Sequence, residues 1–164
     1  MTLDAIGYNH RHDGSFLVDR PDGIGDWLLL LIKSPAIFRA GGENVHALAE
    51  SFIVYTPEAP EYYYPETETY TDDWMHFTPD DDEIRLIRSL NIPLNTPVYA
   101  YNFRSLSSML KYMVYENYSG NRHCRESLNN CFEMLVYKLS EAVSCHPDSA
   151  KAEVFMDGAV SSAQ

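Results

Sequence analysis

Two histidines near the amino terminus, His10 and His12, have the spacing that most directly suggests metal chemistry. Alternate side chains of a β-strand point to the same side, so both imidazoles would face one way and could bind a metal ion. A His-x-His metal motif needs a third ligand some four or five residues later, but residues 14–17 read Gly-Ser-Phe-Leu and carry no carboxylate. The sequence therefore predicts weak metal binding at most, with no functional metal and no cofactor.

Catalysis requires groupings that this sequence lacks. A hydrolase needs a nucleophile held beside a base, and no spacing places serine, histidine and aspartate together on one element. Glycine loops that cradle phosphate are missing as well. The acidic run at residues 80–83 lacks the glycine spacing of a calcium loop and is most simply the start of a helix. We expect no enzyme. The remaining candidates are aromatic and carboxylate residues on strands, which suit a binding pocket.

The amino-terminal half that carries these residues has the pattern of short strands. Glycine and proline turn signals recur about every eight to twelve residues, a spacing that is typical of a sandwich or barrel. We expect strands at residues 15–19, 27–33, 36–39, 44–48, 52–56, 62–64 and 74–77. The predicted fold class is therefore α+β, mainly β, with a jelly-roll barrel followed by a pair of helices.

The carboxy-terminal half changes to the periodicity of helices. After a short helix that starts at the acidic run, two longer helices are expected at residues 105–118 and 122–144. The last one carries an apolar stripe in steps of three and four, formed by Leu128, Cys131, Phe132, Leu135, Leu139 and Val143. Such a stripe packs either against the chain's own core or against a second copy of the chain, and both interpretations remain open.

Charge and composition limit the partners. The 164 residues are enough for one ordinary domain, and 24 acidic residues against 12 basic ones give a net charge of -12. This charge opposes phosphate, so the chain by itself should not bind DNA or RNA. No apolar run reaches the length of a membrane span and no leader pattern is present, so we expect a cytoplasmic protein without a membrane partner. The three cysteines are expected to be reduced thiols.

Three segments follow one another in a recognisable order. They are Asp-Arg-Pro at 19–21 with Gly-Asp-Trp-Leu-Leu at 25–29, Tyr-Thr-Pro at 55–57 with Tyr-Tyr at 62–63, and Trp-Met-His-Phe at 74–77. Together they resemble the amino-terminal sensor domain of AraC-type bacterial transcriptional regulators. In that family an arginine and a glycine precede an aromatic-led strand, a proline turn precedes a tyrosine, and a Trp-x-His/Tyr-Phe strand follows. The likeness covers about residues 8–144.

The resemblance implies a cupin-type jelly roll that binds a small effector, often a sugar or another metabolite. It places the effector at Arg20, Tyr63, Asp72 and Trp74, where Asp72 replaces the histidine of a sugar-responsive member. A sugar has an apolar face and a hydroxyl rim, so Trp74 would be the platform with Arg20 and Asp72 at the rim. The alternative is that Trp74 belongs to the core and that Arg20 and Asp72 form a surface ion pair.

The resemblance also implies a homodimer and a pair of DNA-binding helix-turn-helix motifs that lie outside these residues. We expect an effector-binding barrel with a short acidic helix at 1–100, a helical dimerisation segment at 101–145, and a tail at 146–164 that leads to the absent DNA-binding domain. The predicted dimer seam consists of Leu128, Phe132, Leu135 and Leu139. Two other functions remain open: a metal-dependent cupin enzyme of the isomerase or dioxygenase type, and a dimerisation module without a ligand.

Overall fold

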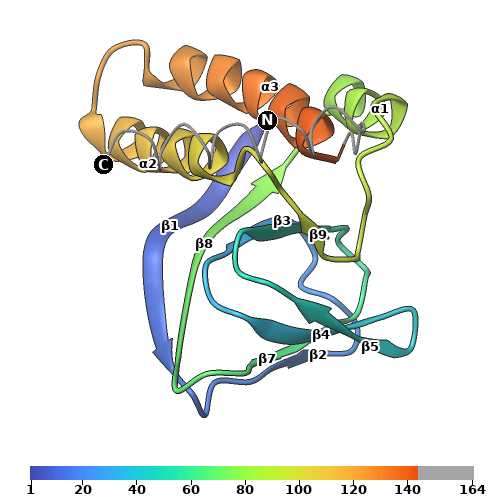
Figure 1. Cartoon of the computed structure of the whole chain (residues 1–164). Helices are drawn as coiled ribbons and strands as arrows, with labels where there is room; N and C mark the ends of the chain where they lie inside the picture. The colour runs from blue at the N-terminus through green and yellow to red at the C-terminus, as the bar shows by residue number, and fades with distance from the viewer. Residues whose placement is uncertain (144–164) are drawn as a thin grey trace, which may run out of the picture.

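The computed structural model describes residues 1–143, in which two antiparallel sheets lie below a layer of helices (Figure 1). The expected tail at 146–164 lies outside the described residues. The strands are β1 (Thr2–Asp13), β2 (Val18–Arg20), β3 (Trp27–Ile32), β4 (Ala36–Ala40), β5 (Glu43–Ala47), β6 (Ser51–Tyr55), β7 (Glu61–Pro65), β8 (Thr69–Thr78) and β9 (Val98–Tyr99). The helices are α1 (Asp81–Ser89), α2 (Phe103–Ser119) and α3 (Cys124–Val143).

The strands follow the order of a jelly roll. One sheet has the order β1-β8-β3-β6-β9 and the other has the order β2-β7-β4-β5. Most successive strands lie in different sheets; among the described strands the exceptions are β4 with β5 and β8 with β9. Neighbouring strands within both sheets pair antiparallel. The predicted fold class, a jelly-roll barrel followed by helices, is confirmed.

The five-stranded sheet separates two hydrophobic cores. All six residues of β3 are buried, because the strand lies at the centre of this sheet and is covered on both faces. Leu28 and Leu30 belong to the core inside the barrel, whereas Leu29 and Leu31 belong to the core beneath the helices. Side chains alternate in the same way along β8, so that Asp72 and its neighbour Asp73 point to opposite faces of the sheet.

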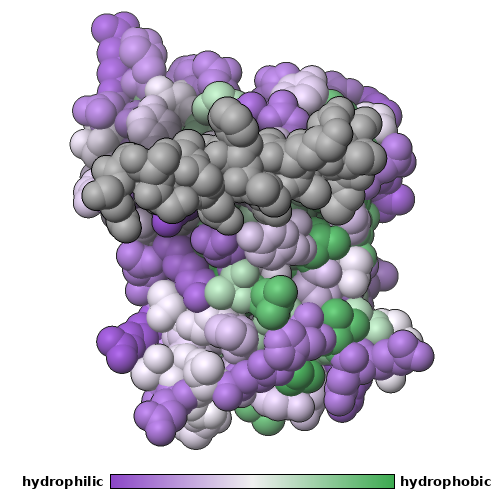
Figure 2. Space-filling model, in the orientation of Figure 1, coloured by the Kyte–Doolittle hydropathy of each residue, from purple (hydrophilic) through white to green (hydrophobic). Residues whose placement is uncertain are grey.

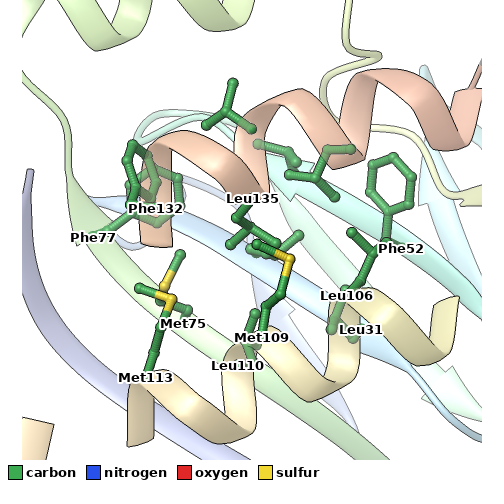
Figure 3. Close-up of a cluster of buried hydrophobic side chains, with 14 of the residues drawn as sticks. Leu31, Phe52, Met75, Phe77, Leu106, Met109, Leu110, Met113, Phe132 and Leu135 are labelled. Atoms are coloured by element: carbon green, nitrogen blue, oxygen red, sulfur yellow. The ribbon is translucent and has the colours of Figure 1, made fainter. Parts of the chain in front are cut away.

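The helical layer buries the stripe that was expected to form the dimer seam. The exposed fractions are 8% for Leu128, 2% for Phe132, 0% for Leu135 and 5% for Leu139. Figure 3 shows Phe132 and Leu135 of α3 among Met75 and Phe77 of β8 and the methionines of α2. The predicted seam is therefore wrong in its residues, because the outer face of the five-stranded sheet is itself apolar and absorbs the stripe. Dimerisation itself remains a prediction.

Strand β1 was not predicted, although it is the longest strand of the described chain. Most of its residues are exposed or half-buried and polar, so neither a continuous apolar run nor a clean alternation marks it. It is the edge strand of its sheet and pairs with β8 alone. Register shifts interrupt this pairing, and Asn9 takes a positive φ of 52° at one of them.

The short acidic helix begins where the charge run predicted it. Asp80 is the N-cap of α1 and accepts a hydrogen bond from the Glu83 backbone N–H at 2.8 Å. The Glu83 side chain accepts one in return from the Asp80 backbone N–H at 2.9 Å, which completes a capping box. This hydrogen bonding lowers the pKa of Asp80.

Polar residues dominate the outline of the molecule in the view of Figure 2, with apolar residues gathered over the strands. Along the described residues 1–143, no helix is both long enough and apolar enough to cross a membrane.

Candidate ligand-binding cavity

A cavity of about 200 Å³ lies inside the barrel, between the two sheets. Arg20, Tyr63, Asp72 and Trp74 all line it, together with the histidines His10, His12 and His76 and the apolar residues Phe16, Val18, Leu28 and Leu30. Residues from β2, β7 and β8 thus meet around one space. Their role in binding a ligand stays a prediction.

Arg20 lies at the half-exposed edge of the cavity. It is opposite Glu61 in the pairing of β2 with β7, and its Nη1 lies 3.1 Å from Glu61 Oε1. The Arg20 side chain is 40% exposed, whereas the Glu61 carboxylate is buried. Burial raises the pKa of Glu61, and the neighbouring guanidinium opposes that rise. The ion pair suggested between Arg20 and Asp72 is therefore wrong: Glu61 is the partner of Arg20.

Asp72 lies deeper than expected. The residue is only 2% exposed, and its Oδ1 atom has no hydrogen-bond partner among the described residues. Burial raises the pKa of Asp72 to about 7; the adjacent Asp73 adds to the rise, while Tyr70 and Lys33 oppose it. Its predicted place at the rim is thus corrected to the buried wall. An unsatisfied buried carboxylate oxygen is costly, so a ligand that donates a hydrogen bond to this atom, or a cation that binds it, would be favoured.

The Trp74 indole is held by two features of β1. Its Nε1–H donates a hydrogen bond to His10 Nδ1 at 2.9 Å. On the opposite strand, Gly7 pairs with Trp74, and a Cβ atom at Gly7 would lie 2.5 Å from Trp74 Cε2. Gly7 therefore makes room for the ring. Sequence reasoning missed Gly7 because it did not predict the strand that carries it.

Tyr63 forms part of an aromatic wall. It is buried, its ring stacks on Phe38 with centroids 4.7 Å apart, and burial raises its pKa well above the usual value. Phe16 contacts Tyr63 edge-on at 6.0 Å and stacks on His12 at 3.9 Å. No pattern in the sequence singled out Phe16, which reaches the cavity from the turn between β1 and β2.

The two histidines of the His-x-His motif face one side of β1, as strand alternation requires. The ring centroids of His10 and His12 are 4.2 Å apart. Asp72 lies directly opposite His10 on β8, and one potential ligand atom from each of the three residues lies within 4.8 Å of the other two. The third potential ligand comes from the neighbouring strand rather than from the same strand four or five residues later.

No protein-family model matches the sequence, and no curated protein matches it either. Among solved structures, ToxT from Vibrio cholerae superposes with a TM-score of 0.54 at 13% identity, over 96% of this chain and 66% of ToxT. CuxR, an AraC-like transcriptional activator, gives a TM-score of 0.49 at 14% identity over 77% of this chain and 45% of CuxR. A fatty-acid-bound ToxT structure gives 0.47 at 11% identity, over 87% of this chain and 56% of that one. The chain spans roughly half to two thirds of these proteins, and it shares its fold with a part of ToxT.

Proposed function

We propose that this chain is the effector-sensing domain of an AraC-type transcriptional regulator and that it binds a small polar metabolite in the barrel cavity. The observation that carries the proposal is the meeting of Arg20, Tyr63, Asp72 and Trp74 around one cavity. An aromatic surface beside a guanidinium and a carboxylate suits a compact molecule with an apolar face and hydroxyl groups, such as a sugar.

The chemistry of the cavity wall favours a polar ligand over a long apolar one. Three histidines, an arginine and a buried carboxylate contribute to the lining. A bound alkyl chain would leave the unpaired Oδ1 of Asp72 without a partner, whereas a hydroxyl group could donate a hydrogen bond to it. One of the similar ToxT structures contains an unsaturated fatty acid, so a fatty acid is the natural competing ligand in the test.

A route from the cavity to the helices starts at the next residue of β8. Asp73 is fully buried and accepts hydrogen bonds from the Ser107 hydroxyl of α2 at 2.7 Å and from the Asn9 backbone N–H at 2.8 Å. Lys33 completes the cluster with its Nζ 2.9 Å from Asp73 Oδ1. A ligand that moves Asp72 would therefore shift the anchor of α2, because both carboxylates share one stretch of backbone.

The regulatory output lies outside this chain in the proposal. The net charge of -12 opposes binding to phosphate, so DNA would be recognised by a separate helix-turn-helix domain. A homodimer formed through the helices would have to use the outer faces of α2 and α3, where Tyr112, Tyr115 and Met134 are exposed, because the inner faces are buried.

A fluorescence titration tests the proposed ligand class. Monosaccharides and other polar metabolites are titrated into the chain in one arm, and an unsaturated fatty acid in the other, while tryptophan emission is followed. We expect saturable binding of a polar metabolite that Arg20→Ala weakens and that Arg39→Ala, a change at an exposed arginine stacked on Tyr62, leaves intact. Saturable binding of the fatty acid alone would contradict the proposed ligand class.

A further inference from the structure

Three side chains at the cavity wall have the chemistry of a transition-metal site. His10 and His12 of β1 and Asp72 of β8 each offer a ligand atom, and all three atoms lie within 4.8 Å of one another. Two imidazoles and one carboxylate form a donor set that suits Zn²⁺ and Fe²⁺ and that leaves coordination positions open. Ligand atoms bound to Zn²⁺ at about 2.1 Å in tetrahedral directions are roughly 3.4 Å apart. The three ligand atoms would therefore have to approach one another by about 1.5 Å at most to bind the ion.

The second observation is the unsatisfied carboxylate. Asp72 is only 2% exposed, and it lines the cavity. Its Oδ1 atom has no hydrogen-bond partner among residues 1–143. A protein rarely buries a carboxylate oxygen that has no hydrogen-bond partner, and a metal ion is a common reason for one.

We propose that His10, His12 and Asp72 bind one divalent transition-metal ion, with open coordination positions directed into the cavity. Oxygen atoms of a bound small molecule could take those positions. The metal site does not rest on the regulatory role, because the metal alone is the ligand in its test.

The surrounding charges permit a cation at this place. Arg20 also lines the cavity, but Glu61 lies 3.1 Å from it and balances its charge. Lys33 is paired with Asp73 at 2.9 Å on the other face of the sheet. The carboxylate of Asp72 is thus left for the ion.

Trp74 reports on the site. A neutral imidazole has one lone pair, and His10 uses its own to accept the hydrogen bond from Trp74 Nε1–H at 2.9 Å. A metal ion at His10 takes that lone pair and releases the indole. Metal binding should therefore change the emission of Trp74, and Trp74→Phe should remove this change while keeping the metal.

Calorimetric titration with Zn²⁺ tests the proposal on the whole chain. We expect one equivalent to bind, with affinity reduced at least about tenfold in His12→Gln and in the isosteric Asp72→Asn. His46→Gln is the matched control, because His46 is 52% exposed and paired with Glu66 away from the cavity. Mg²⁺, which prefers oxygen ligands, should not compete at equal concentration.

Two outcomes overturn the proposal. One is the absence of stoichiometric Zn²⁺ binding by the wild-type chain. The other is wild-type affinity in both His12→Gln and Asp72→Asn, with their folds checked by circular dichroism. Cobalt substitution separates this site from the free thiols Cys124 and Cys131, since thiolate ligands add intense near-ultraviolet absorption that a His₂-Asp site lacks.

Discussion

Substitutions at Leu135 test whether the apolar stripe of α3 packs in the chain's own core. The residue is fully buried, and Figure 3 shows it between α2 and the sheet. The void beside it measures only about 10 Å³, so the surrounding side chains are closely packed. Replacing leucine by alanine at such a position removes buried methyl groups and leaves a cavity that its neighbours fill only in part.

The expected cost of Leu135→Ala is about 3 kcal/mol of unfolding free energy, within the range of about 2–5 kcal/mol for buried leucines. For a chain of this size, that loss lowers the midpoint of thermal unfolding by roughly 6–12 °C. The neighbouring Met134 is 50% exposed, so Met134→Ala should change the unfolding free energy by no more than about 0.5 kcal/mol.

Urea unfolding followed by far-ultraviolet circular dichroism measures both variants. Analytical ultracentrifugation of Leu135→Glu adds a second criterion: a buried carboxylate should prevent folding, whereas a residue at a dimer seam should yield a folded monomer. A folded, monomeric Leu135→Glu, or a loss below about 1 kcal/mol for Leu135→Ala, would refute the placement of α3 on the sheet.

Three further outcomes follow from the structure. Gly7→Ala should displace the Trp74 ring, since the added Cβ would lie 2.5 Å from it, and should shift tryptophan emission at a cost of about 1–3 kcal/mol in stability. The pKa of Asp80 is lowered in the folded chain. The ionised Asp80 side chain therefore stabilises the fold above the pKa of the unfolded state, and this stabilisation is lost as the pH falls through the pKa of the folded state. The difference in melting temperature between wild type and Asp80→Ala should therefore narrow below about pH 4. In a gel shift at physiological salt, the chain alone should not retard DNA at submicromolar concentration, because its net charge is -12.

The sequence predicts the jelly roll and the helices because turns and apolar periods mark them directly. An amphipathic stripe, however, looks the same whether it faces a sheet or a second chain, so the partner of α3 could not be derived from the stripe itself. The run of six apolar residues in β3 does contain the missing signal. A strand buried on both faces requires a covering layer on each side: the second sheet covers the barrel side, and the helices cover the other.

The cavity shows the same division between local and non-local information. Arg20, Tyr63, Asp72 and Trp74 are implied by the resemblance to AraC-type sensor domains, but their partners depend on strand pairing. The contact of Arg20 with Glu61 and the approach of His10 to Asp72 both arise from register across strands. Single-sequence patterns do not determine such register when the edge strand is polar, as β1 is.

Native mass spectrometry most directly tests the claim that the barrel cavity binds a small polar effector. The chain is incubated with a panel of sugars and other polar metabolites, beside Arg20→Ala at the cavity mouth and Arg39→Ala as the control away from it. We predict that wild type and Arg39→Ala retain one molecule of the same metabolite and that Arg20→Ala loses it. Retention of no polar metabolite by the wild-type chain, or equal retention by all three proteins, would contradict the account.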